Sequence, residues 1–332
     1  MMIRAAYRCL FACLVILTGV GAPPASPQVR FTRTPDRIAV EIDGKPYTGF
    51  FLSADGNKPY LYPLRTASGV IVTRHFPMEE FAGETKDHPH HRGMFFSHGD
   101  INGYNFWATE PVPAGAAAAK KGSPSRRGRM ALKDVPQMKD GRRTGTIQAL
   151  FDGLDPQGRP IMTETRTLTF HSDPKLRIID FDIRIAAIEK LKFGDTKEGT
   201  FGIRLATSIS EDAKLGGRMV NAAGKQTEKE VWGKRAAWLD YYGPVDGQTV
   251  GVLVMDHPGN PRHPTYWHTR AYGLLGANAF GVHDFLNDKT QDGSMVVEAG
   301  QSVRFRYRVV VHPGDVNAIQ PAELFKRFAA VK

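Results

Sequence analysis

The sequence predicts an all-β protein, a large antiparallel β-sandwich of the supersandwich kind with a short C-terminal helix. Apolar and polar residues alternate with a period of two in many segments, as in strands that bury one face. These segments are separated by turn signals such as Asp-Gly and only rarely by helical patterns. So many strands with so few crossover helices favour antiparallel sheets packed face to face over a parallel α/β sheet.

The first residues have the pattern of a secretory signal peptide. Arg4 and Arg8 precede an apolar stretch over residues 10–20, and small residues follow it. This stretch is about half the length that a membrane span needs. We therefore expect residues 1–25 to be removed, with cleavage near Ala22 or Ala25, and the protein to be periplasmic or secreted without a membrane span.

Composition sets the class of the remaining chain. With 41% hydrophobic and 23% charged residues in a chain of 332, we expect residues 29–332 to form one soluble domain. Both cysteines, Cys9 and Cys13, lie in the predicted signal peptide, so the mature protein has no disulfide and no cysteine nucleophile. The net charge of +10 is concentrated in residues 110–143, which we interpret as a basic, solvated loop insertion. Its alternative role is binding of an anion. Since no nucleic-acid motif accompanies it, we expect no nucleic-acid partner.

The expected elements follow from the two periodicities. The clearest strand alternates Ile179, Phe181, Ile183 and Ile185 with charged residues. In chain order, the expected strands are 37–42, 47–52, 70–73, 146–151, 162–170, 179–185, 200–207, 250–255, 272–275 and 303–311. The helix is expected at the C-terminus, where a proline suited to the first turn precedes one apolar stripe, formed by Leu324, Phe325 and Phe328 after Pro321.

A cluster of histidines is the strongest local signal for chemistry. Four of the 11 histidines, His88, His90, His91 and His98, lie close together in the sequence, and imidazole both titrates near neutral pH and binds metals. Pro89 favours a rigid, displayed loop over a helix or a central strand.

Two mechanisms fit this cluster. In one, the four histidines, with Asp87 or Asp100, hold a divalent zinc, manganese or iron ion. In the other, which we favour, a histidine acts as general acid or base and Arg92 binds the substrate without a metal. No cofactor is therefore predicted, and a divalent metal is the alternative.

The second half of the chain supplies further candidate residues. Glu198 stands before the glycine that opens an expected strand, where its carboxylate could face a pocket. Trp267, His268 and Arg270 combine an aromatic ring with planar hydrogen-bonding groups, as sugar-binding sites do. The other tryptophans, at positions 107, 232 and 238, are expected in the core.

Several of these blocks resemble one family. They are Asp-His-Pro-His-His-Arg-Gly at 87–93, His-Gly-Asp-Ile-Asn-Gly at 98–103, Lys-Glu-Gly-x-Phe-Gly-Ile-Arg at 197–204 and Trp-His-x-Arg-x-Tyr-Gly at 267–273. The chain resembles the DUF6807 family of exported bacterial proteins, also labelled PmoA or methane oxygenase-like, from about residue 37 to 328. This resemblance implies a place among carbohydrate-catabolic proteins. The all-β pattern is also similar to the galactose mutarotase-like supersandwich, whose sites use histidines and a glutamate on a concave sheet.

Together, these observations predict an exported carbohydrate-active enzyme, a hydrolase, lyase or epimerase, that uses histidine and glutamate for acid–base catalysis. We predict His91 and His98 as proton donors and Glu198 as the base. The residues predicted to bind the carbohydrate substrate are His90, Arg92, Asn102, Trp267, His268, Arg270 and Asn278. One alternative is a metal-dependent oxygenase or hydrolase that uses the histidine cluster. The other is a non-catalytic glycan-binding protein.

Overall fold

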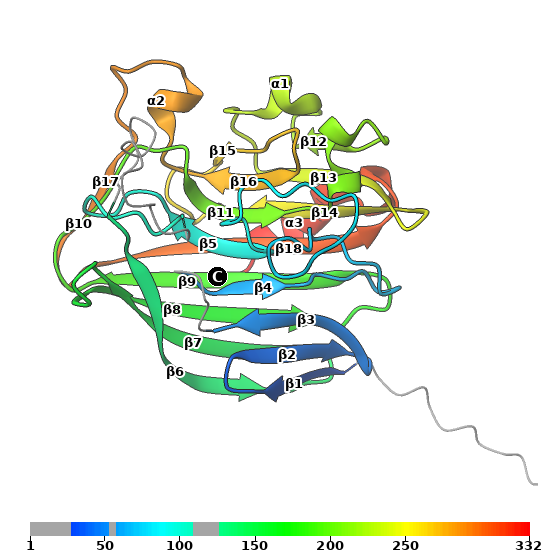
Figure 1. Ribbon diagram of the computed structural model, residues 1–332, viewed down its shortest axis with the longest axis horizontal. Helices are drawn as coiled ribbons and strands as arrows, with labels where there is room; N and C mark the ends of the chain where they lie inside the picture. The colour runs from blue at the N-terminus through cyan, green and yellow to red at the C-terminus, as the bar shows by residue number, and fades with distance from the viewer. Residues whose placement is uncertain (1–27, 53–57, 109–125) are drawn as a thin grey trace, which may run out of the picture.

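The chain forms two eight-stranded antiparallel sheets, as the computed structural model shows (Figure 1). The structure describes residues 28–52, 58–108 and 126–332. The predicted signal peptide and residues 109–125 of the predicted basic insertion lie outside these ranges. Within them, no helix is long and apolar enough to cross a bilayer.

The first sheet contains strands from both halves of the sequence. In spatial order it consists of β1 (Val29–Arg33), β2 (Arg37–Ile42), β3 (Lys45–Phe51), β4 (Tyr60–Tyr62), β5 (Met94–His98), β11 (Gly199–Arg204), β16 (Leu274–Asn278) and β15 (Tyr266–Trp267). Because β11 pairs with β5 on one side and β16 on the other, the predicted histidine block and the two distal blocks meet on this sheet.

The second sheet holds the longest strands. Its order is β12 (Arg218–Asn221), β13 (Trp238–Val245), β14 (Gln248–Asp256), β18 (Ser302–Pro313), β9 (Arg177–Ala187), β8 (Pro160–His171), β7 (Thr144–Leu154) and β6 (Arg129–Lys139). A small separate pair is formed by β10 (Leu191–Phe193) and β17 (Met295–Val297). The helices are α1 (Thr227–Val231), α2 (Val282–Phe285) and α3 (Pro321–Ala329).

The main core fills the space between the sheets. In β9 the apolar residues of the alternating pattern are buried and the charged residues between them face outward, as the period of two requires. The ring of Phe181 meets the ring of Phe201 from β11 edge to face, with centroids 5.1 Å apart. The predicted all-β sandwich is confirmed.

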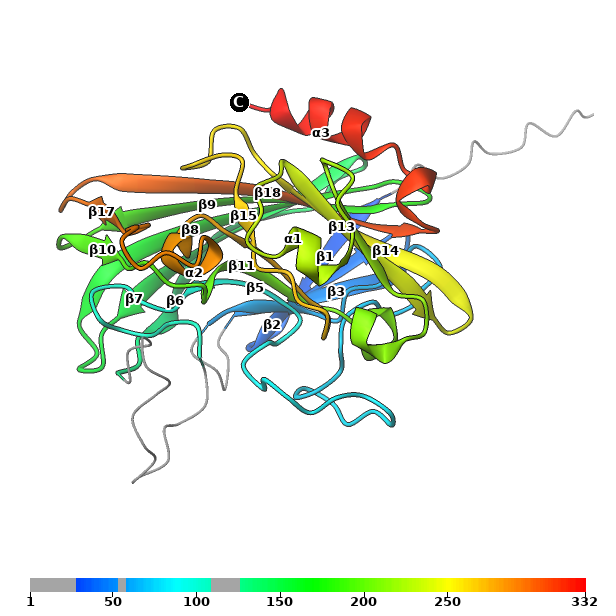
Figure 2. The same ribbon diagram turned by 90° about the horizontal axis from the view of Figure 1, so that it is seen from above.

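The C-terminal helix is confirmed as well. In α3, Pro321 occupies the first turn, and Leu324 and Phe328 are buried. They pack on Leu253 and Val310 at the outer face of the second sheet. Figure 2 shows α3 on one side of the two sheets and the loop between β4 and β5 on the opposite side.

Three expected elements differ from the structure. Residues 70–73 form only isolated bridges, one of them between Thr73 and Leu205. The strand expected at 272–275 begins at Leu274, because Tyr272 lies in the preceding turn. The basic segment expected as a loop to residue 143 contains β6, an edge strand. Both faces of β6 are largely exposed, so it lacks the apolar alternation by which strands are recognised.

Candidate functional site

The histidine block lies in a long loop over residues 74–93, between β4 and β5, which we call the histidine loop. The side chain of Asp87 fastens this loop to the sheet. Its Oδ1 is 2.6 Å from Nη1 of Arg74 and 2.7 Å from Nη2 of Arg204, the last residue of β11. Its Oδ2 accepts a hydrogen bond from Nδ1 of His88 at 2.5 Å. One carboxylate therefore fixes the loop, β11 and the first histidine together.

Asp87, Arg74 and Arg204 form a clamp in which ion pairs and hydrogen bonds outweigh the effect of burial on the carboxylate. Burial raises the pKa of Asp87, but the charge of Arg204 and the hydrogen bond from His88 outweigh it, and the pKa falls to about 2. Burial and the neighbouring Arg204 lower the pKa of Arg74 to about 10. The carboxylate of Asp87 and the guanidinium groups of Arg74 and Arg204 are thus charged at neutral pH, and Asp87 is not a proton donor at that pH.

A glycine sets the exit of the histidine loop into β5. Gly93 has φ +50°, and a Cβ at this position would lie 2.2 Å from the carbonyl oxygen of Leu61. Only glycine has neither the steric penalty for this φ nor the clash. Gly93 therefore allows the backbone turn by which the histidine loop enters β5 and which places the three preceding histidines against the sheet.

His91 forms the floor of this region. Its ring is stacked on His88, with centroids 5.0 Å apart, and meets the ring of Trp107 edge to face at 5.7 Å. The residue is 1% exposed, and neither ring nitrogen has a hydrogen-bond partner among the described residues. Burial, with the charges of His90 and Arg204, holds the pKa of His91 well below its usual value. His91 is therefore a neutral, covered imidazole. Its predicted role as a proton donor stays a prediction.

Glu198 stands immediately before β11, next to a second required glycine. The amide of Gly99 donates to the carbonyl oxygen of Glu198 at 2.6 Å. A Cβ on Gly99 would lie 2.7 Å from the Cβ of Glu198, so this close approach depends on glycine.

The carboxylate of Glu198 is ionised and partly exposed. Its Oε1 is 3.0 Å from Nζ of Lys197, and a quarter of the side chain is exposed. Burial raises the pKa of Glu198, but interactions with His268, Lys197 and, more weakly, His90 lower it below its usual value. Glu198 thus has the charge state of a general base, and it lies close enough to the imidazoles of His268 and His90 for their charges to affect its pKa.

A tryptophan fixes the tautomer of His268. Nε1 of Trp232, the residue that ends α1, donates to Nδ1 of His268 at 3.1 Å. Because an indole N–H only donates, Nδ1 must be the acceptor, and neutral His268 carries its proton on Nε2. Burial lowers the pKa of His268 to about 4. His268 is therefore a neutral N–H donor at pH 7, beside the charged Glu198.

Aromatic rings and guanidinium groups surround this pair. The guanidinium carbon of Arg204 lies 4.6 Å from the ring centroid of Tyr272. That of Arg270 lies 5.7 Å from the same ring and 5.9 Å from the ring of Trp232, while Nε of Arg270 pairs with Glu228 at 2.8 Å. Burial raises the pKa of Tyr272 to about 12 against the opposing charges of the two arginines. We call the group that contains His88, His90, Glu198, Trp232, His268, Arg270 and Tyr272 the Glu198 site.

His98 and Asn278 lie outside the Glu198 site. His98 points to the inner face of β5, where its ring contacts Phe193 and Phe280 and its Nε2 is 3.0 Å from the carbonyl oxygen of Gly194. Burial lowers the pKa of His98 to about 4. Asn278 is buried and donates to the carbonyl oxygen of Thr196. The structure gives both residues packing partners, and their catalytic and binding roles stay predictions.

Three other predicted binding residues have separate environments. Asn102 occupies a turn with φ 54° and donates to Glu189 and to the carbonyl oxygen of Lys190. Arg92 is half-buried, with its guanidinium carbon 5.9 Å from the ring centroid of Tyr60. Trp267 is fully buried in the core. The ring of Trp267 has no accessible face in this structure, and its predicted role in carbohydrate binding stays a prediction.

The predicted metal set does not assemble. Because His98 faces the sheet interior, it is separated by β5 from His88, His90 and His91. Across residues 28–52, 58–108 and 126–332, no group of three or more His, Cys, Asp or Glu side chains is arranged to hold a metal ion. The histidines of the loop instead stack on one another and on Tyr272.

Some residues of the Glu198 site were not predicted. Tyr272, and Arg204 of the neighbouring clamp, lie within two of the blocks on which the family resemblance rests, so their positions were visible as motif residues without a role. Trp232 was expected in the core, but it is only half-buried and contacts His268. No periodic signal marks it, because α1 is a five-residue helix without an apolar stripe.

The site can now be set beside known proteins. Residues 37–326 match the family of unknown function DUF6807. No curated protein has a matching sequence. Among solved structures, the fold is similar to galactose mutarotase-like proteins from Clostridium acetobutylicum and Lactobacillus casei, each 9% identical. The match to the Clostridium acetobutylicum protein has a TM-score of 0.45 and covers 87% of this chain and 99% of that protein. The match to the Lactobacillus casei protein has a TM-score of 0.40 and covers 86% of this chain and 100% of that protein. An α-galactosidase from Lactobacillus brevis is 10% identical with a TM-score of 0.39, and 92% of this chain covers 43% of that enzyme. Likeness at this level concerns the chain path alone.

Proposed function

This chain belongs to the DUF6807 family, and we propose that it is an exported enzyme that transfers protons on a sugar or sugar derivative at the Glu198 site. Of the three reaction classes expected from the sequence, the geometry favours a lyase or an epimerase over a hydrolase. The observation that supports this most directly is the juxtaposition of an ionised Glu198 with a neutral imidazole donor, His268.

The pair has complementary protonation states at neutral pH. Glu198 can take a proton from a hydroxyl or an activated C–H group of the substrate. The Nε2–H of His268, or the phenol of Tyr272, can give a proton to the oxygen that gains charge. An ionised carboxylate with a neutral imidazole N–H donor in the same site is an arrangement that enzymes use to move a proton and to hold the oxygen that gains charge.

The surroundings of the pair support a sugar as the substrate. Trp232 is a half-buried aromatic ring, and such rings stack on the C–H faces of pyranoses. The ring of Tyr272 is already stacked on His88, with centroids 4.8 Å apart, so Tyr272 would contribute its phenol group. The guanidinium of Arg270, between the two rings, offers N–H groups in a fixed plane for hydroxyl or carboxylate oxygens.

A two-carboxylate hydrolase is less consistent with the site. Most glycosidases use a second carboxyl group, as an acid with a raised pKa or as a base or nucleophile. Here Asp87 is clamped between two arginines with a pKa of about 2, and Glu228 is paired with Arg270. Glu198 is therefore the carboxylate of the Glu198 site that can exchange protons with a substrate.

The proposal is tested with the exported protein and a panel of aldoses, uronic acids and their methyl glycosides. Incubation in D2O reports proton exchange and elimination by NMR, and polarimetry reports epimerisation. We expect turnover of at least one compound, and a fall of about 10²–10⁴-fold in Glu198→Gln. Glu323→Gln, on the exposed face of α3, is the matched control and should keep full activity.

Each other outcome contradicts the proposal. Equal turnover in wild type and Glu198→Gln would remove the assigned base. Binding of a sugar by calorimetry without turnover of any compound would instead identify a glycan-binding protein. N-terminal sequencing of the protein recovered from the periplasm or the medium tests the proposed export.

A further inference from the structure

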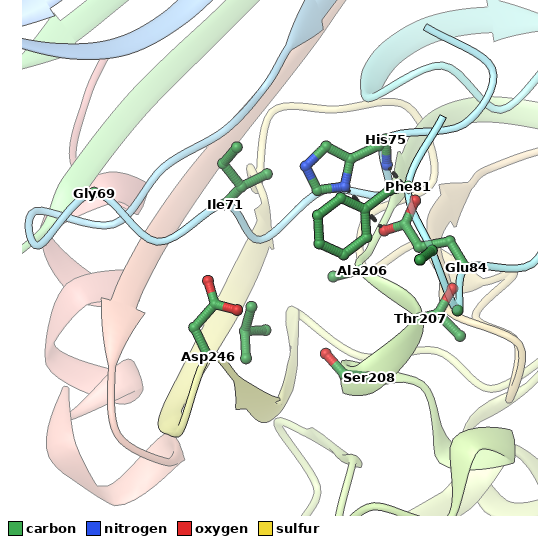
Figure 3. Close-up of a pocket in the computed structure, with 12 residues that line it drawn as sticks. Gly69, Ile71, His75, Phe81, Glu84, Ala206, Thr207, Ser208 and Asp246 are labelled. Atoms are coloured by element: carbon green, nitrogen blue, oxygen red, sulfur yellow. Dashed lines mark hydrogen bonds and ion pairs between the residues drawn. The ribbon is translucent and has the colours of Figure 1, made fainter. Parts of the chain in front are cut away.

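A cavity of about 360 Å³ lies beside the first half of the histidine loop. Its walls come from the first half of the histidine loop, the 3-10 turn after β11 and the hairpin between β13 and β14 (Figure 3). The cavity has the size of a small-molecule pocket. The loop is continuous with the catalytic side, because Thr85 donates its amide to Thr207 at the cavity and receives a hydrogen bond from Arg204 of the clamp.

One wall is an exposed aromatic ring held in a fixed orientation. Phe81 is 53% exposed, and its ring is stacked on that of His75 with centroids 4.3 Å apart and an interplanar angle of 9°. His75 is fixed by Glu84, which accepts from its backbone amide at 2.7 Å and lies 3.2 Å from its Nδ1. Figure 3 shows this stack at one side of the cavity. A large apolar ring is thus accessible at the cavity and held in one orientation by its stacking on His75.

The opposite wall offers hydrogen-bonding groups. The carboxylate of Asp246 and the hydroxyl of Ser208 make no hydrogen bond or ion pair with the described residues. Ile71 and Val245 supply apolar surface between them and the aromatic ring, and neither lysine nor arginine lines the cavity. An anionic ligand would meet only carboxylates here. A neutral, polyhydroxylated ring with one apolar face fits all three features.

We propose that this cavity binds a neutral sugar unit of a longer substrate, with its C–H face on Phe81 and its hydroxyls on Asp246 and Ser208. This inference rests on the proposed function, which it deepens by naming an oligosaccharide as the substrate class. Glu84 at the cavity and His88 of the Glu198 site are four residues apart, so their Cα atoms are separated by at most about 14 Å. Linked sugar rings can occupy both places at once.

The test uses the exported protein on a glycan microarray that carries monosaccharides and neutral oligosaccharides of plant and bacterial origin. We expect selective binding of neutral oligosaccharides of two or more units. Phe81→Ala and Asp246→Asn should each weaken binding of the same glycans at least about tenfold. Met138→Ala, which shortens an exposed apolar side chain on β6, is the control and should bind as wild type does.

The outcomes separate this inference from the proposed function. Binding to no neutral oligosaccharide, or binding that is unchanged in both cavity variants, would overturn the inference. Loss of turnover in Glu198→Gln together with cavity-independent binding would overturn the cavity alone. Phe81-dependent binding in a protein whose turnover ignores Glu198→Gln would instead leave the cavity and overturn the assigned chemistry.

Discussion

The replacement Asp87→Asn tests whether one carboxylate holds the histidine loop on the sheet. Asp87 has a pKa of about 2 in place of 3.8, a fall worth about 2.5 kcal/mol at pH 7. Because 36% of the side chain is exposed, solvent screening reduces this to about 1–1.5 kcal/mol. The variant also leaves Arg74 and Arg204 buried without their counter-ion, and breaking a buried pair costs about 3–5 kcal/mol. Since asparagine keeps one acceptor, we expect a total loss of about 2–4 kcal/mol.

The pH dependence gives this prediction its sign. A carboxyl group whose pKa is lowered by folding adds stability above its unfolded value of 3.8, and this stability is lost as pH falls toward 2. About half of the pKa-linked part should remain at pH 3. Urea denaturation followed by circular dichroism at pH 7, 5 and 3 measures the difference between wild type and Asp87→Asn.

The control for this experiment is Asp246→Asn, because that carboxylate has no partner among the described residues. It should change stability little at any of the three pH values. The reasoning fails if Asp87→Asn costs less than about 0.5 kcal/mol at pH 7. It also fails if its cost is the same at pH 7 and pH 3.

Three other changes test particular residues of the fold and the site. Trp232→Phe removes the indole N–H donor, so ¹⁵N NMR spectra of the His268 ring should show the Nδ1–H tautomer. Turnover of the enzyme should fall about tenfold. Unchanged ¹⁵N chemical shifts would disprove the assigned tautomer. Gly99→Ala forces a methyl group against Glu198 and should cost about 1–3 kcal/mol, which a melting temperature equal to that of wild type would contradict. Trp267→Ala shortens a core side chain and should lower the free energy of unfolding by about 3–5 kcal/mol in a denaturant titration. A small loss of stability together with weakened sugar binding would instead support the predicted role of Trp267 in binding.

The long strands could be predicted from sequence because each buries only one face. β9 and β18 alternate over their whole length, so the period of two is visible without any knowledge of their neighbours. β5 is buried at all five positions and therefore shows no alternation. β4 and β15 contain only three and two residues, which is too short for an alternating pattern to be recognised.

Prediction of the site is limited in another way. The block at 87–93 forms a loop, as expected, because Pro89 restricts the backbone locally. The side chain directions of His98 and Trp267 depend on which face of the first sheet is covered. That is decided by the second sheet, whose strands are far away in sequence. The tautomer of His268 likewise depends on Trp232, which is 36 residues away.

Some of the positively charged residues of the chain lie on the edge strand β6. An open sheet edge invites another chain to add a strand, and lysines, prolines and bulges on the edge oppose this. β6 carries Lys133, Lys139 and Pro136 in exposed positions, and its register shifts on both sides of Asp134. Among the described residues, β6 is the longest edge strand, and these features make it a poor template for intermolecular sheet growth. Lys133 and Lys139 thus lie where their charges oppose the addition of another strand.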